Sequence, residues 1–294
     1  MTNPGRRTRG LSLCATWQLR YAGRMIAELG SASLSFDDEG PRGSDVLLLI
    51  HGHPFNRSMW RPQLGAVTAK GWRVIAPDLR GYGGSSPVAG IVAFEEFGSD
   101  LLGLLDVLTI DRVVVGGLSM GGQIAMEVCR QAPERIRGLL LAATFPQSES
   151  LEGKTRRFAM ADRLIKEGMA GYAVEVLPKM VGATCLQERP EVGQAVLEMM
   201  RGTDPQGAAA ALRARASRPS YEPTLAQFAR PSTVVVGDED AFTSRGDAEK
   251  MVSLLTDCNL NWMARVGHMP NLERPGEFNA ALVHLLDRVR AAPH

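Results

Sequence analysis

The pentapeptide Gly117-Leu118-Ser119-Met120-Gly121 decides the fold prediction, because it joins an apolar β-branched run at residues 113–115 to an amphipathic pattern at residues 123–130. The run predicts a buried strand and the pattern predicts a helix. At a sharp turn between them, two glycines leave no Cβ on the inside, so the serine hydroxyl is held outward. The helix N-terminus would then face any oxyanion formed there. Ser119 is therefore a candidate nucleophile.

Short apolar runs alternate with longer amphipathic segments along the rest of the chain, a pattern typical of a mostly parallel sheet flanked by helices. The predicted strands are residues 25–29, 32–36, 46–50, 73–76, 113–115, 138–142, 233–236 and 260–264, the first two as a hairpin and the others buried on both faces. The predicted core helices are residues 58–69, 94–108, 123–131, 248–255 and 275–290. The sequence thus predicts an α/β fold with eight strands.

Residues 145–229 contain no buried-strand run, only helical stretches such as residues 155–167, 192–201 and 206–216. Such a segment is too long for a loop in a compact domain. It predicts a helical cap, inserted after the sixth strand and roofing the crevice at the carboxyl edge of the sheet. The predicted division is an Arg-rich extension at residues 1–24, a core at residues 25–144 and 230–294, and the cap at residues 145–229.

The composition limits the class of partner. The chain has 294 residues, 45% of them hydrophobic, with 33 basic and 32 acidic residues and a formal net charge of +1. This balance gives no excess of positive charge that would attract nucleic acid or an anionic membrane, so we expect a small, largely uncharged ligand. No stretch approaches the roughly 20 apolar residues that span a bilayer. A homodimer remains open.

Cysteine usage and the N-terminal region favour a cytoplasmic protein. The four cysteines are widely spaced and form no metal-finger pattern, which is typical of reduced thiols; they are Cys14, Cys129, Cys185 and Cys258. Three arginines precede the apolar residues 11–15, superficially like a signal sequence. That apolar run is too short for one. We expect residues 1–24 to pack loosely and the first strand to begin at Met25.

A serine nucleophile requires a base, and histidine has the pKa that suits this role. The five histidines are His51, His53, His268, His284 and His294. His268 follows the last predicted strand, where a loop can bring the imidazole over the sheet edge. His284 falls in the terminal helix and His294 in the tail. We therefore expect His268 to be the base, oriented by an acid.

Three carboxylates follow the strand at residues 233–236, in the sequence Gly237-Asp238-Glu239-Asp240. A turn beginning at Gly237 would return the third toward the strand end, so Asp240 is the expected acid. Asp238 and Glu239 are expected to be solvated turn residues. The chain order Ser119, Asp240, His268 is the order associated with nucleophile-elbow hydrolases.

Backbone donors for an oxyanion should come from Met120 and from the loop after the strand at residues 46–50. In that loop the N–H of His53 is the natural donor, because Pro54 has none. His51 and His53 form an H-x-H pair that could suggest a metal, but no further ligand set accompanies it. We expect neither a metal nor a cofactor.

The segments HGHPF, APDLRGYGGSS, GLSMGG, VVVGDEDAF and VGHMPNLERP match in order and spacing the pattern of the α/β-hydrolase superfamily, which the chain resembles from residue 25 to residue 290. The resemblance implies Ser119 as nucleophile, His268 as base and Asp240 as acid, with His53 and Met120 at the oxyanion hole. Within the superfamily, the short cap and residues 208–223 are similar to the 3-oxoadipate enol-lactonase and small carboxylesterase group.

These features predict a serine esterase or lactonase acting on a small ester, lactone or thioester through an acyl-enzyme intermediate. The candidate substrate-pocket residues are Phe55, Trp60, Phe145, Met160 and Met180. Thioesterase, carbon–carbon bond hydrolase and cofactor-free perhydrolase activities remain open, because the triad alone does not choose the substrate. A further alternative is a non-catalytic small-molecule-binding protein with the same α/β-hydrolase fold.

Overall fold

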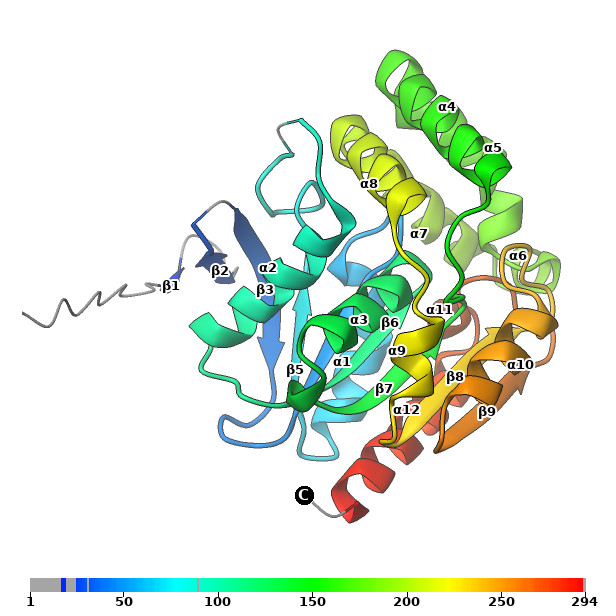
Figure 1. The fold of residues 1–294 in the computed structure, drawn as a ribbon. Helices are drawn as coiled ribbons and strands as arrows, with labels where there is room; N and C mark the ends of the chain where they lie inside the picture. The colour runs from blue at the N-terminus through cyan, green and yellow to red at the C-terminus, as the bar shows by residue number, and fades with distance from the viewer. Residues whose placement is uncertain (1–16, 20–24, 31, 89, 293–294) are drawn as a thin grey trace, which may run out of the picture.

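The computed structural model describes residues 17–19, 25–30, 32–88 and 90–292, which form one nine-stranded sheet with helices on both faces (Figure 1). The strands are β1 (Trp17–Leu19), β2 (Met25–Glu28), β3 (Ser33–Glu39), β4 (Val46–Ile50), β5 (Arg73–Pro77), β6 (Val113–Leu118), β7 (Ile136–Ala142), β8 (Ser232–Gly237) and β9 (Cys258–Met263). They lie in the order β1-β2-β3-β5-β4-β6-β7-β8-β9. The pairs β1–β2, β2–β3 and β3–β5 are antiparallel and the other five pairs are parallel. The sheet is therefore mostly parallel, as the sequence predicted for an α/β fold.

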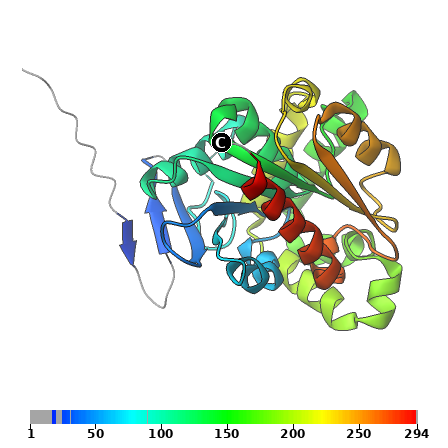
Figure 2. The same ribbon diagram turned by 90° about the horizontal axis from the view of Figure 1, so that it is seen from below.

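Helices cover the sheet from two sides. The helices outside the cap region are α1 (Arg61–Thr68), α2 (Phe94–Val107), α3 (Met120–Gln131), α10 (Arg245–Leu254), α11 (Pro270–Glu273) and α12 (Pro275–Ala291), with short 3₁₀ turns at Arg57–Trp60 and Pro133–Arg135. Figure 2 shows α2, α3 and α10 on one side of the sheet, and α1 and α12 on the other.

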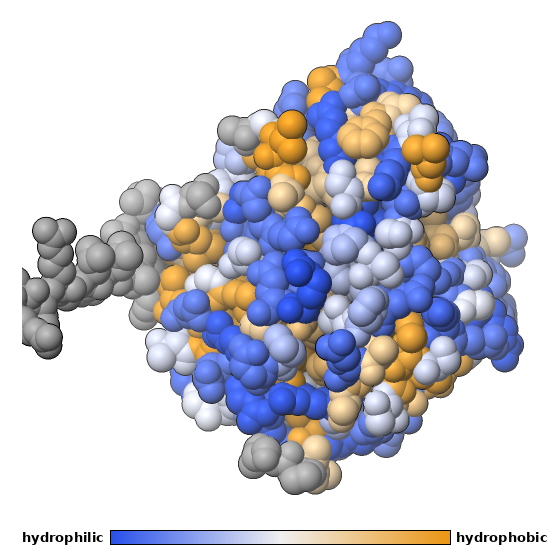
Figure 3. Space-filling view, viewed as in Figure 1, coloured by the Kyte–Doolittle hydropathy of each residue, from blue (hydrophilic) through white to orange (hydrophobic). Residues whose placement is uncertain are grey.

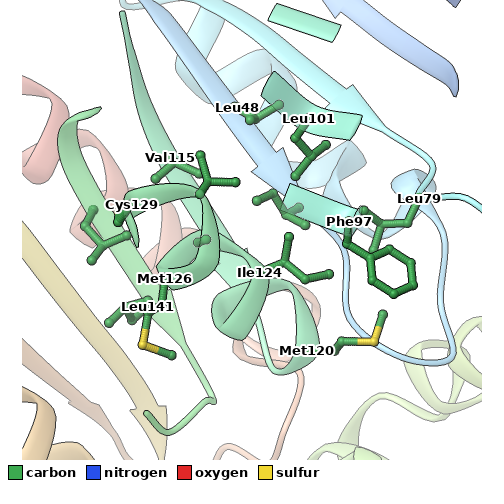
Figure 4. Close-up of a cluster of buried hydrophobic side chains, with 14 of the residues drawn as sticks. Leu48, Leu79, Phe97, Leu101, Val115, Met120, Ile124, Met126, Cys129 and Leu141 are labelled. Atoms are coloured by element: carbon green, nitrogen blue, oxygen red, sulfur yellow. The ribbon is translucent and has the colours of Figure 1, made fainter. Parts of the chain in front are cut away.

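Two hydrophobic clusters follow from the alternation of side chains along the buried strands. In β4, Leu48 and Ile50 pack into the cluster under α2 and α3, whereas Leu47 and Leu49 pack into the cluster under α1 and α12. Figure 4 shows part of the first cluster, in which the side chain of Met120 points among core residues. Because both faces of the central strands are covered, these strands are apolar throughout.

The first strand lies earlier than the sequence predicted. Trp17–Leu19 forms β1, which pairs antiparallel with β2 in the register Trp17↔Ala27. The prediction that Met25 begins the first strand was therefore wrong. Pairing with β1 satisfies backbone N–H and C=O groups along an edge of β2 that would otherwise be unpaired. The remaining residues of the predicted extension lie outside the described residues.

Two element boundaries also differ from the predictions. Helix α3 begins at Met120, directly after Ser119, rather than at Gln123. Strand β9 was predicted to be buried on both faces, but it lies at the sheet edge beside β8 alone, and Leu260 is exposed. An edge strand has one neighbour, so its side chains stay partly in contact with solvent.

Six helices stand between β7 and β8, where the sequence predicted a helical cap. They are α4 (Leu151–Glu167), α5 (Met169–Met180), α6 (Ala183–Glu188), α7 (Pro190–Arg201), α8 (Pro205–Ser217) and α9 (Glu222–Ala226). The sequence pattern predicted α4, α7 and α8 but not the other three. Figure 1 places α4, α5 and α8 above the carboxyl ends of the parallel strands and α9 beside α10.

The surface of this helical segment carries several exposed apolar side chains, including Leu151, Phe158 and Val174. The space-filling view shows apolar residues scattered among hydrophilic ones over the helices at its top (Figure 3). Across the described ranges, no helix combines the length and apolar character needed to cross a bilayer.

Candidate active site

Ser119 occupies a strained turn between β6 and α3. Its backbone has φ 56° and ψ −115°, a left-handed conformation that is rare for any residue but glycine. Its N–H donates to the carbonyl of Ala142 (2.9 Å), and its carbonyl accepts from the hydroxyl of Thr144 (2.8 Å). These bonds tie the turn to the end of β7 and stabilise the strained conformation.

The two glycines of the motif are required by close backbone approach. A Cβ on Gly117 would lie 2.1 Å from the carbonyl oxygen of Gly121, and a Cβ on Gly121 would lie 2.1 Å from that of Ile50. Neither backbone oxygen can move without displacing a strand or the start of α3. Both positions therefore exclude any side chain, which is a stricter steric requirement than the sequence alone indicated.

His268 and Asp240 form a buried pair at the ends of β8 and β9. The Nδ1 atom of His268 lies 2.9 Å from each carboxylate oxygen of Asp240. Their side chains are 2% and 0% exposed. Asp240 also accepts from the N–H groups of Phe242 (2.8 Å) and Thr243 (3.2 Å). Burial acts to raise the pKa of Asp240, but the charge and hydrogen bonds of these partners outweigh it and lower that pKa.

The other two carboxylates of the turn have specific partners, so describing them as merely solvated was incomplete. Asp238 accepts from the backbone N–H groups of Arg265 (2.6 Å) and Val266 (3.3 Å), which lead into the His268 loop. Glu239 accepts from the N–H of Thr184 at the start of α6 (3.0 Å). These bonds connect the turn to the two segments beside it.

Glu273 was missed by the sequence analysis and holds the loop that carries His268. It is 1% exposed and accepts from the N–H groups of Gly267 (2.8 Å), Met269 (2.9 Å) and Gly182 (3.0 Å). Gly267 and Met269 flank His268, so this one carboxylate fixes the loop on both sides of the imidazole. Its position five residues after His268, in a segment already quoted, was the only available signal.

A cavity of about 200 Å³ lies between the sheet edge and the helical segment above it. Its lining includes Ser119, His268, His53, Gln123, Ala143, Thr144, Phe145, Arg157, Tyr172, Met180, Leu212, Arg215 and Phe242. The structure thus brings Ser119 and His268, 149 positions apart in the sequence, to one cavity. Phe242 packs edge-on against the imidazole of His268, with ring centroids 4.8 Å apart.

The predicted pocket residues divide into three groups. Phe145 and Met180 line this cavity. Met160 lines an adjacent cavity of about 320 Å³, which shares Arg157, Tyr172, Leu212 and Phe242 with the first. Phe55 and Trp60 line neither, so the expectation for them was wrong. Both are fully buried in the cluster under α12, where Trp60 packs against Phe278.

The two predicted oxyanion donors come from the loop after β4 and from the first turn of α3. Met120 is the first residue of α3, so its N–H has no partner within the helix. His53 lines the cavity, and within the described ranges its backbone N–H makes no hydrogen bond. Its imidazole Nδ1 lies 2.8 Å from the hydroxyl of Tyr82, and burial holds its pKa well below the ordinary value.

The remaining histidines lie away from the cavity or outside the described residues. His51 is fully buried, accepts from the N–H of Leu79 at Nε2 (2.9 Å) and contacts the carbonyl of Gly52 through Nδ1 (2.9 Å). His284 is exposed on α12, and His294 falls outside the described range. Among the described residues no three His, Cys, Asp or Glu side chains are grouped to hold a metal.

Comparison with known proteins decides the family. Residues 47–281 match the model of the alpha/beta hydrolase family, which covers most of the chain. The chain belongs to the alpha/beta hydrolase family. Among its relatives, 3-oxoadipate enol-lactonase 1 of Acinetobacter baylyi is 25% identical over 254 residues, which cover 86% of this chain and 93% of that protein.

Two solved structures extend the comparison. A thermophilic esterase from Thermogutta terrifontis, with malate bound, has a TM-score of 0.84 and 34% identity over 88% of this alpha/beta hydrolase and 94% of that chain. The enol-lactonase from Burkholderia xenovorans has a TM-score of 0.82 and 26% identity, and the match covers 89% of this chain and 99% of that chain. The resemblance noted from the sequence motifs to the enol-lactonase and esterase group is thereby confirmed.

Proposed function

We propose that this alpha/beta hydrolase cleaves a small carboxylic ester or lactone, with Ser119 as nucleophile, His268 as base and Asp240 as orienting acid. The observation that carries the proposal is the buried His268–Asp240 pair, whose histidine lines the same cavity as a serine held at a strained strand-to-helix turn. Esterase and enol-lactonase relatives support the same substrate class.

The first half of the reaction follows from these positions. With Nδ1 of His268 held at Asp240, its Nε2 is the nitrogen left to accept the Ser119 proton. The serine oxygen attacks the carbonyl carbon, and the N–H groups of His53 and Met120 stabilise the resulting oxyanion. The imidazolium then protonates the leaving oxygen as the carbon–oxygen bond breaks. In a lactone, the released alcohol stays attached to the acyl group.

The second half uses the same groups with water as the nucleophile. His268 takes a proton from water, the hydroxide attacks the acyl carbon, and Ser119 leaves with that proton restored. The carboxylate of Asp240 stabilises the positive charge that forms on His268 in each half. Its lowered pKa keeps it ionised in this role at neutral pH.

Substitution of Ser119 tests the proposal. We expect Ser119→Ala to lower kcat on small aryl esters by about 10⁴-fold or more, by analogy with other triad deletions, while the fold survives. Retention of the wild-type melting temperature would show that the variant is folded. Near-normal turnover by a folded Ser119→Ala protein would overturn the acyl-enzyme route, and no turnover by the wild type on esters, lactones or thioesters would favour a binding protein.

A further inference from the structure

Thr203 joins the helical segment to the loop that carries His53. It lies between α7 and α8 and is 7% exposed. Its hydroxyl donates to the carbonyl of Pro54 (2.7 Å), 149 positions earlier in the chain, and lies 3.2 Å from the carbonyl of Met199. A hydroxyl carries one proton, so the shorter contact is the stronger hydrogen bond. A side chain of the helical segment therefore holds the residue next to the expected oxyanion donor.

A second contact fixes the same end of α8. A Cβ on Gly207 would lie 1.9 Å from the carbonyl oxygen of Gly81, in the loop after β5, so the two backbones touch there. Asp204 caps the helix by accepting from the N–H groups of Gln206 (2.7 Å) and Gly207 (3.4 Å). The junction between α7 and α8 is thus anchored to two loops of the core, and Thr203 forms one of these anchors.

The bond from Thr203 leads to His53 through two peptide planes. The carbonyl of Pro54 and the N–H of Phe55 belong to one rigid plane, and that N–H donates to the carbonyl of Gly52 (3.0 Å). The carbonyl of Gly52 and the N–H of His53 belong to the next plane. Holding the oxygen of each plane therefore fixes the direction of the His53 N–H.

His51 holds the carbonyl of Gly52 as well. Because its Nε2 accepts from the N–H of Leu79 (2.9 Å), its proton is on Nδ1, which donates to the Gly52 oxygen (2.9 Å). The oxygen end of this plane thus has two donors, whereas the N–H of His53, beside the cavity, has no partner among the described residues. An N–H that is fixed in direction and unpaired is preorganised for an oxyanion.

We propose that Thr203 is a positioning residue, which aims the N–H of His53 at the oxyanion through the loop that begins at Gly52. This role rests on the proposed hydrolase function and extends it to a residue of the helical segment. An oxyanion forms only after the serine attacks, so a donor that is aimed less well raises the energy of the transition state but not that of the bound ester. Loss of the Thr203 hydroxyl should therefore lower kcat and leave KM nearly unchanged.

Substitution of Thr203 tests this role. Thr203→Val keeps the shape of the side chain and removes the hydroxyl. We expect kcat on p-nitrophenyl acetate to fall by about 5- to 10-fold, which is the range of one neutral hydrogen bond, with KM within about twofold of the wild-type value. Thr203→Ser restores a hydroxyl and should recover most of the wild-type kcat. A wild-type kcat in Thr203→Val, or equal losses in both variants, would overturn the positioning role.

Thr155→Val is the matched control. Thr155 is exposed on α4, its hydroxyl donates to the carbonyl of Leu151 (3.0 Å), and it lines neither cavity. This variant should keep the wild-type kcat. If Thr203→Val does not fold, Thr203→Ala removes the same hydroxyl with a smaller side chain and carries the same expectation. A wild-type kcat in a folded Thr203→Ala protein would also overturn the role.

A mimic of the tetrahedral intermediate separates positioning from a merely structural role. The Ser119 oxygen adds to the carbonyl carbon of 1,1,1-trifluorobutan-2-one, the carbonyl oxygen becomes an oxyanion, and His268 takes the serine proton. In Thr203→Val, the inhibition constant of this ketone should rise by about the factor by which kcat/KM falls. That of butan-2-one, which forms no stable adduct, should not change. Equal changes for the two ketones would contradict the role.

Labelling by a fluorophosphonate distinguishes failure of this role from failure of the hydrolase proposal. Negative charge develops on the phosphonyl oxygen at the same donors, so Thr203→Val should slow the labelling of Ser119 by about the factor seen in kcat. If the wild type is labelled but hydrolyses no ester, the two labelling rates decide the role of Thr203, and equal rates would overturn it. Absence of labelling in the wild type would overturn the hydrolase proposal, and this role with it.

Discussion

The Nδ1 atom of His268 lies 2.9 Å from both carboxylate oxygens of Asp240, in a pair that is almost completely buried. This contact fixes which ring nitrogen faces the carboxylate, and it leaves the other nitrogen for the cavity that Ser119 lines. The two residues lie in the loops that follow adjacent parallel strands, β8 and β9, so the pairing of these strands brings the two loops to one edge of the sheet.

Asp240→Asn should preserve the shape of the site but lose most of the activity. An amide donor facing Nδ1 favours the wrong imidazole tautomer, so we expect kcat to fall by about 10⁴-fold with a small change in melting temperature. Steady-state kinetics on the preferred ester checks this. Asp238→Asn is the matched control, since Asp238 contacts backbone N–H groups and not the imidazole. Similar losses in both variants would contradict the role given to Asp240.

Gly121→Ala should destabilise the fold strongly. The added methyl group would meet the carbonyl oxygen of Ile50 at 2.1 Å, and we expect the free energy of unfolding to drop by about 3 kcal/mol. Urea denaturation measures the change. Gly65→Ala is the control, because Gly65 lies in α1 with open space around its Cβ position. That variant should gain up to about 1 kcal/mol from helix propensity.

Glu273→Ala should impair both stability and turnover, because it leaves three buried N–H groups without an acceptor. The penalty for one such group is about 1 to 3 kcal/mol. Glu273→Gln retains one acceptor oxygen and should be milder. We expect kcat to fall more than KM changes in Glu273→Ala, because the His268 loop moves while the cavity wall remains. Wild-type kcat in a folded Glu273→Ala protein would exclude the positioning role.

Stability should decline as the pH falls below about 6.5. Burial lowers the pKa of His51 from its ordinary 6.5 and lowers that of His53 well below it, so the unfolded chain takes up protons before the native one does. The stabilisation is complete above pH 6.5 and is lost as the pH decreases toward the native values. Each proton contributes a slope of up to about 1.4 kcal/mol per pH unit.

Substitution of His51 tests this pH dependence. Urea unfolding from pH 7.5 to 5 should show a shallower slope in His51→Gln than in the wild type. His284→Gln, at an exposed position of α12, is the control and should keep the wild-type slope. An unchanged slope in His51→Gln would exclude the contribution of His51.

Local patterns were sufficient to predict the parallel sheet and the positions of Ser119, Asp240 and His268 in the loops that follow its strands. Each depends on a few adjacent residues, such as two glycines around a serine or a carboxylate after a buried strand. The three-residue strand β1 was missed because so short a run has no periodicity. Phe55 and Trp60 were misassigned because proximity to His53 in sequence does not reveal the direction of a side chain.

The contacts of Arg157, Arg215 and Arg218 could not be predicted for a different reason. Arg215 meets Gln123 across 92 positions of sequence, through the packing of α8 above α3. Periodicity identifies α8 as a helix, but it does not show which helix packs against it or that Arg157 and Arg218 share the carboxylate of Glu149. Glu273 likewise acquires its role from three backbone N–H groups, two of them beside His268 and one at Gly182 before α6.

The central claim is that Ser119 is an activated nucleophile, and reaction with a fluorophosphonate followed by peptide mass spectrometry tests it most directly. The account predicts stoichiometric modification of Ser119 in the wild type, at a rate that falls at least about 100-fold in a folded His268→Ala protein. An unmodified Ser119 in folded wild-type protein, or labelling at another serine, would contradict it.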